Sequence, residues 1–177
     1  THIAMPLFPL FVEALRGTSE AASSITGGIL TVNAAAAVIS TGVLGHAGDR
    51  WGHKRVLVLS TLAAAVLLLL HAAAQNVGHL VALRFLLGLT AAGIQPSASA
   101  LVRSVVPEHS IGKAFGIVQS VRSAGAAIGP LAGGYISAHY AGMMGFRVPF
   151  LVTGALLLLV PLTVLLFVRI PRRGQAA

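Results

Sequence analysis

The residues best suited to chemistry in this sequence are the charged side chains of residues 45–55, GHAGDRWGHKR. Asp49 stands beside Arg50 and close to Lys54 and Arg55, and apolar runs flank the segment on both sides. These side chains could form ion pairs with one another, or the cations could hold a phospholipid surface. We also expect Asp49 to face the N-terminus of a neighbouring helix, where the helix dipole favours an anion.

The same segment contains Gly45, Gly48 and Gly52, which permit sharp backbone turns and close approach of helices. The spacing therefore predicts a short loop that joins two helices and holds charged groups at its surface. The alternative is a simple anchor that keeps this loop on the positively charged side of a membrane.

The composition of the chain indicates whether these groups belong to a soluble protein or to a membrane protein. Of the 177 residues, 56% are hydrophobic and 9% are charged, whereas a soluble domain carries about 25% charged residues. The net charge of +8 comes from basic residues at the ends of apolar runs, as in membrane proteins. No basic face with interleaved aromatic residues is visible, so we expect no nucleic-acid partner. Cysteine is absent, which excludes disulfides and thiolate metal sites.

The apolar runs predict an all-α membrane protein, a six-helix transmembrane bundle forming one domain over residues 1–177. Crossing a bilayer takes about 20 apolar residues, and continuous runs without period-two alternation favour helices over barrel strands. The first run is shorter than this, so we expect a truncated first helix. The predicted spans are 3–15, 24–46, 56–75, 79–103, 113–137 and 147–169. In the connection before the fifth span, Ser110 is expected to cap the helix that follows.

Lysine and arginine residues predict the orientation of the bundle, because cytoplasmic loops carry more of them. Arg16 and Arg147 fall on one side. The other side holds Arg50, Lys54, Arg55, Arg103, Lys113, Arg169, Arg172 and Arg173. Residues 45–55, residues 104–112 and the C-terminus are therefore expected in the cytoplasm.

A few polar residues lie inside the apolar spans and are candidates for a central cavity. Arg84 is well inside its span, where a charge costs about 2.5–3.5 kcal/mol on insertion scales and should face a cavity or a partner. Gln119 and Arg122 lie three residues apart on one helix face, and Asn33 and Gln95 could join them. The alternatives are an Arg84 side chain that reaches the outer interface, and interhelical hydrogen bonds without a role in binding.

The fifth span carries a regular set of small residues. Gly125, Gly129 and Gly133 recur every four residues and should form one smooth helix face for close packing. Pro130 should bend that helix, because it removes a backbone hydrogen bond. Generic helix packing is the alternative. The whole pattern consists of Gly116, Gly125, Gly129, Pro130, Gly133 and Gly134.

Enzymatic chemistry has little support in the sequence. The histidines are dispersed without metal-ligand spacing, and neither a nucleophile motif such as G-x-S-x-G nor a phosphate-binding loop is present. We therefore expect neither an enzyme nor a metal site. Carboxylates are few, and only Glu13 could lie at membrane depth. A proton-coupled exporter needs a buried titratable group, so we expect that carboxylate in another part of the protein.

Three motifs resemble those of the major facilitator superfamily. Residues 45–54 resemble its loop signature G-x-L-A-D-R-x-G-R-K, with departures at Ala47, Gly48 and His53. Arg84, Gly88 and Gly93 resemble its R-x-x-x-G helix motif. The glycine pattern of the fifth span resembles the antiporter motif of the drug:proton exporters, and the last spans look like the C-terminal helices of bacterial multidrug exporters. The resemblance covers nearly the whole chain.

The resemblance implies a secondary active transporter of the inner membrane that exports small amphipathic compounds by proton antiport and alternating access. It implies no cofactor, because the proton gradient supplies the energy. The expected partners are membrane lipid, a small-molecule substrate and a missing N-terminal six-helix half, with residues 45–55 acting as a conformational switch. The alternatives are a transporter of another solute, such as a sugar or organic anion, and a helical membrane module that does not transport.

Overall fold

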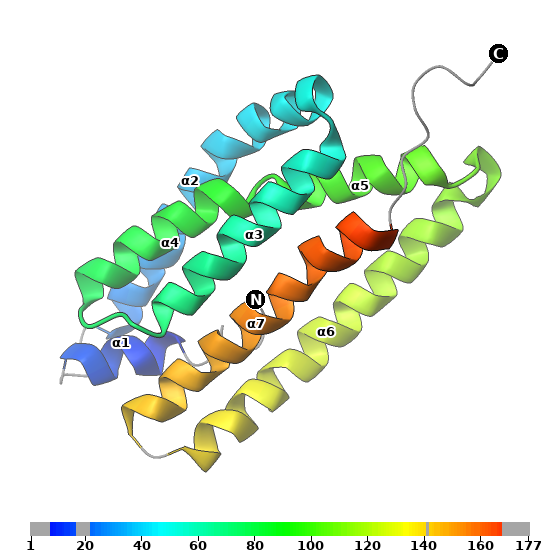
Figure 1. Cartoon of the computed structure of the whole chain (residues 1–177). Helices are drawn as coiled ribbons and strands as arrows, with labels where there is room; N and C mark the ends of the chain where they lie inside the picture. Colours follow the sequence, from blue (N-terminus) through cyan, green and yellow to red (C-terminus); the bar gives the residue numbers. More distant parts are fainter. Residues whose placement is uncertain (1–7, 17–21, 141, 168–177) are drawn as a thin grey trace.

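The computed structural model describes residues 8–16, 22–140 and 142–167, and every element among them is helical (Figure 1). This confirms the all-α class, and helices overlie the described part of each predicted span, whereas residues 3–7, 168 and 169 of the first and last spans lie outside the described residues. The helices are α1 (Phe8–Arg16), α2 (Ala22–Trp51), α3 (His53–His71), α4 (Val77–Ala91), α5 (Ile94–Val105), the short 3-10 helix η1 (Glu108–Ser110), α6 (Ile111–His139) and α7 (Met143–Phe167).

Among the described residues, four stretches are long and apolar enough to cross a membrane: Ser24–Trp51, His53–His71, Val77–Val105 and Met143–Leu166. Such runs form helices because a helix satisfies its backbone polar groups within one segment, which a bilayer requires. Helix α6 spans 29 residues but is not among the four, since glycines, serines and its charged residues make it less apolar.

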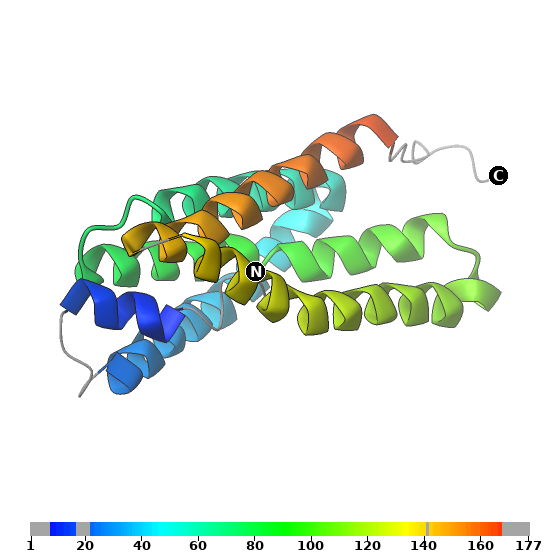
Figure 2. The same cartoon turned by 90° about the horizontal axis from the view of Figure 1, so that it is seen from below.

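The core lies where α1, α2, α3, α4 and α7 meet. Helix α3 packs most extensively against α7, and α2 packs against α4, so these elements lie side by side in both views (Figures 1 and 2). The largest fully buried apolar side chains are Phe11, Val12, Leu68, Leu80 and Phe150. They hold one end of the bundle together by removing apolar surface from solvent.

Helix α6 lies at the edge of this bundle (Figures 1 and 2). Among the described residues it packs on α7 and, at its beginning, on α5 and η1. Large apolar side chains such as Val121, Ile128 and Leu131 are exposed on it. A face of this composition is suited to lipid or to further protein, not to water.

The segment 45–55 is not the loop that the sequence predicted. Helix α2 continues to Trp51 and α3 begins at His53, so Gly52 alone separates them. Gly52 has a φ of 95°, a conformation that residues with a β-carbon rarely adopt. One glycine therefore reverses the chain, and the charged residues sit on the ends of two helices.

The predicted span 79–103 is also divided. Helix α4 ends at Ala91 and α5 begins at Ile94. Pro96 has no N–H to donate to the carbonyl of Ala92, so the helical hydrogen-bond ladder is interrupted there. Pro96 lies inside the predicted span, and the prediction of one continuous helix did not take its missing N–H into account.

Two connections show how helix ends are closed. The Asn76 side chain accepts a hydrogen bond of 2.9 Å from the N–H of His79, which caps α4. Ser110 precedes α6 but makes no capping hydrogen bond with its side chain, so that expectation was wrong. Its backbone N–H instead donates to Pro107 in the 3-10 turn, which already shapes the entry to α6.

Candidate functional site

The junction between α2 and α3 gathers the charged residues of the chain's most polar segment. The Gly52 N–H donates a hydrogen bond of 2.9 Å to the carbonyl of Gly48 and so closes α2. The N–H of Arg55 donates to the carbonyl of Gly52 at 3.1 Å and starts α3. The side chains of this segment are therefore positioned by two helix ends and not by a flexible loop.

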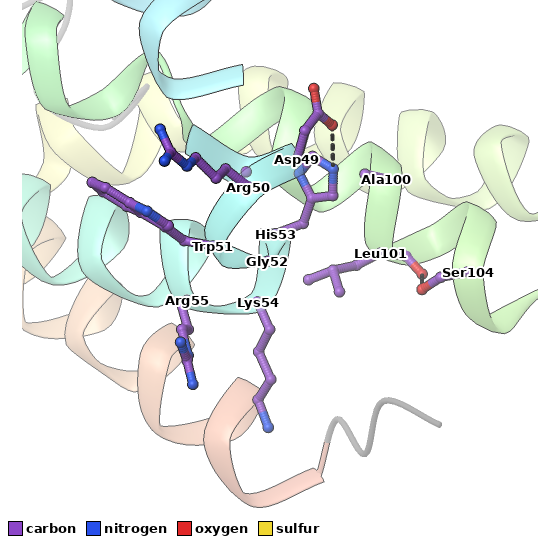
Figure 3. Close-up of a pocket in the computed structure, with 11 residues that line it drawn as sticks. Asp49, Arg50, Trp51, Gly52, His53, Lys54, Arg55, Ala100, Leu101 and Ser104 are labelled. Atoms are coloured by element: carbon purple, nitrogen blue, oxygen red, sulfur yellow. Dashed lines mark hydrogen bonds and ion pairs between the residues drawn. The ribbon is translucent and has the colours of Figure 1, made fainter. Parts of the chain in front are cut away.

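The carboxylate of Asp49 contacts the ring of His53, and the two form an ion pair when the imidazole is protonated. The distance from the carboxylate to His53 Nε2 is 3.2 Å (Figure 3), and the aspartate side chain is 75% exposed while the histidine is 27% exposed. From the sequence, Asp49 was expected to face a helix N-terminus or to pair with Arg50, Lys54 or Arg55. His53 was not predicted as its partner. The two residues are only four apart in the sequence, which was the available signal, although the turn at Gly52 places Asp49 on α2 and His53 on α3.

Gly48 and His53 are both departures from the superfamily signature, and they touch each other. A β-carbon on Gly48 would lie 2.7 Å from His53 Cε1 and closer still to its Nδ1. The histidine ring therefore needs a glycine at position 48. Two substitutions that look independent in the sequence form one structural unit.

An open cleft of about 1110 Å³ lies between this junction and α5. The side chains of Lys54 and Arg55 extend in a similar direction, while Arg50 and Trp51 project to another side (Figure 3). The cleft is lined by Gly48, Asp49, Arg50, Trp51, Gly52, His53, Lys54, Arg55, Ala100, Leu101 and Ser104. Its chemistry is that of charge pairing at a membrane surface. No group of three or more metal-binding side chains occurs among the described residues.

Arg84 lies inside the bundle, with only 3% of its surface exposed. The side-chain amide of Asn33 on α2 donates a hydrogen bond of 3.0 Å to its backbone carbonyl. Gly88, one turn along α4, lies directly against the backbone of Asn33. The structure therefore brings Asn33 and Arg84 together at a close crossing of α2 and α4.

The other cavity candidates lie elsewhere. Gln95 is exposed at the start of α5, and Gln119 and Arg122 are exposed on α6. The expectation that these side chains face a central cavity stays a prediction. The exposure of Gln119 and Arg122 reflects the place of α6 at the edge, which no local pattern in the sequence reveals. Their role in binding stays a prediction.

The glycine face of α6 is covered only in part. Gly129 and Gly133 are buried, whereas Gly125 is exposed and has no atom within 4 Å of the position of a β-carbon. Gly116 and Gly134 are open in the same way. The helix remains continuous through Pro130. Close packing is thus present around Pro130, and the bend expected there stays a prediction.

Comparison with known proteins found a matching protein family and several similar proteins. The model of the Major Facilitator Superfamily matches residues 1–177. The multidrug resistance protein MdtG of Salmonella paratyphi C is 36% identical to the chain over 168 residues, and that of Salmonella typhi is equally similar. Each match covers 94% of this chain and 40% of the relative.

Proposed function

Because the chain belongs to the major facilitator superfamily, we propose that it is part of a secondary active transporter that exports small amphipathic compounds by proton antiport. The observation that carries this proposal is the 36% identity to multidrug resistance protein MdtG along 94% of the chain. The apolar helices make the chain a multi-pass membrane protein. The inner membrane is the proposed location, with the α2–α3 junction and the C-terminus in the cytoplasm.

The exposed face of α6 supports a further protein partner in this transporter. It presents Val121, Ile128 and Leu131, together with the polar Gln119 and Arg122. An arginine facing acyl chains is costly, so this face is better suited to a second helical bundle with a polar cavity between the two. The N-terminal six-helix half is the proposed partner, since the chain spans 40% of its relatives' length.

Alternating access then requires the α2–α3 junction to change its contacts. Asp49 is half of an exposed ion pair, and such pairs are weak enough to form and break. The side chains of Arg50 and Arg55 beside it are exposed and positioned to contact the membrane surface or the partner bundle. We propose that this segment works as a switch between two arrangements of the bundles.

Export from inverted membrane vesicles tests the function. We expect a fluorescent cationic dye to accumulate when a proton gradient is imposed, and accumulation to collapse when an ionophore dissipates the gradient. Sugars and organic anions should not compete with the dye. Accumulation that ignores the gradient would refute proton antiport, and competition by a sugar or organic anion in place of drugs would reassign the substrate. If neither drugs nor sugars nor organic anions are transported, the result would favour a helical membrane module that does not transport.

A further inference from the structure

His71, the last residue of α3, is a titratable residue enclosed within the bundle. Its side chain is 0% exposed. Its ring lies 5.4 Å from that of Phe150 on α7, with an angle of 16° between the planes, and Phe150 in turn contacts Phe11 on α1 at 5.8 Å. The imidazole is therefore held in an aromatic wall where three helices meet.

A backbone hydrogen bond determines which ring nitrogen carries the proton. His71 Nδ1 lies 2.6 Å from the carbonyl oxygen of Leu67. A carbonyl only accepts, so Nδ1 is the donor, and in the neutral ring Nε2 must carry the lone pair. Nε2 is buried and has no hydrogen-bond partner among the residues that the structure describes. A base is thus enclosed in an apolar surrounding, which is costly unless something binds it.

The charges near this base act in opposite directions. Arg84 is buried on α4, the helix that packs beside α3, and its positive charge opposes a second positive charge on His71. The C-terminus of α3, where His71 sits, favours a cation through the helix dipole. This end of the bundle also carries Arg147 on α7 and Glu13 on α1, and α2 has no charged residue between Ser24 and Asn33.

We propose that His71 Nε2 is a proton-binding site of this bundle and that its occupation is coupled to the position of the Arg84 side chain. The proton adds to the Nε2 lone pair while Nδ1–H stays bonded to Leu67. The imidazolium then repels Arg84, and release of the proton removes this repulsion. Since α3 and α4 lie side by side (Figure 1), this repulsion acts between two packed helices. The consequence for transport rests on the proposed proton antiport.

The site itself is tested without transport, by nitrogen NMR of histidine-labelled protein in lipid nanodiscs. His71→Asn identifies the His71 signals. We expect the neutral ring to carry its proton on Nδ1 and to gain a second proton on Nε2 as the pH falls. In Arg84→Gln, the proton occupancy of His71 at a given pH should rise, because the opposing charge is gone. An Nε2–H neutral form, a ring that never titrates, or an occupancy indifferent to Arg84→Gln would each overturn the proposal.

Transport measurements test the coupling. Asparagine at position 71 can still donate to Leu67 but cannot bind the proton. His71→Asn should lose gradient-driven accumulation of the dye and keep exchange of dye for dye, which needs no net proton movement. The matched control is His79→Asn, which changes an exposed histidine at the same end and should keep both activities. Gradient-driven export that survives His71→Asn would overturn the proposal even though the proposed function stands. Lack of export by the unchanged protein would defeat that function, and NMR would still decide the site.

Discussion

The imidazole of His53 occupies the space that a β-carbon on Gly48 would need. This contact gives the first prediction. Gly48→Ala should displace the ring, break the Asp49–His53 ion pair and lower the stability of the junction. The superfamily signature has alanine and arginine at these positions, so the double variant Gly48→Ala/His53→Arg should recover stability, with a coupling energy of about 0.5–3 kcal/mol in a double-mutant cycle.

The measurement for that cycle is thermal unfolding in detergent. Gly45→Ala is its matched control, because that glycine is also on α2 and has nothing within 4 Å of a β-carbon position. The control should gain about 0.5–1 kcal/mol from the better helix former. Additive effects of the two changes at 48 and 53 would show that their contact has no energetic consequence.

Asp49→Asn should impair export while the protein still inserts in the membrane. The change preserves shape but removes the only negative charge of residues 45–55 and with it the ion pair to His53. Dye export from vesicles, normalised to the amount of protein in the membrane, measures the loss. Glu108→Gln, which neutralises an exposed carboxylate in η1, should export normally. If Asp49→Asn exports normally, the α2–α3 junction does not act as a switch and serves only to fix the orientation of the chain in the membrane.

Gly88→Ala should weaken the crossing of α2 and α4. Its β-carbon would meet the backbone carbonyl of Asn33 and, at 2.7 Å, its side-chain nitrogen. Because backbone atoms cannot rotate away, the helices must separate, at a cost of about 1–3 kcal/mol in unfolding free energy. Gly28→Ala on α2 has open space around it and should not destabilise the protein. Equal unfolding temperatures for the two variants would contradict the close crossing.

Gly129→Leu should lose export, or let protons leak, although the protein reaches the membrane. Gly129 is buried, so a leucine there must push a neighbouring segment away. Gly125→Leu places the same side chain on the same helix at an exposed position and should be tolerated within this bundle. Proton leak is measured with a pH-sensitive dye inside vesicles. If Gly125→Leu impairs export more than Gly129→Leu, the packing that matters for function involves the exposed part of the glycine face.

Pro96→Ala should join α4 and α5 into one helix. Alanine restores the N–H that can donate to the carbonyl of Ala92, which closes the interrupted ladder. We expect the amide at position 96 to exchange slowly with deuterium and the angle between the two helices to decrease. Spin labels near the two helix ends report the angle. A fast-exchanging amide at 96 would show that the packing of Gly93 against Ser60 and Leu44 maintains the break without the proline.

The apolar runs by themselves determined that the chain forms long helices in a membrane protein. A bilayer leaves the backbone no other partners than its own, so composition and length are sufficient for that inference. A turn in this segment was likewise expected from Gly45, Gly48 and Gly52, and the structure places the reversal at Gly52. The motif positions around it also sufficed to indicate the superfamily.

Only the tertiary structure decided which side chains meet. His53 contacts Asp49 because α2 continues to Trp51 and α3 begins directly after Gly52. Gly129 is covered while Gly125 is open, and Arg84 is enclosed while Arg122 is exposed, although each pair looks alike in the sequence. Helical periodicity tells which residues share a face, but burial of that face depends on helices distant in the chain. The enclosed Nε2 of His71 arises in the same way, because Phe150 reaches it from the last helix.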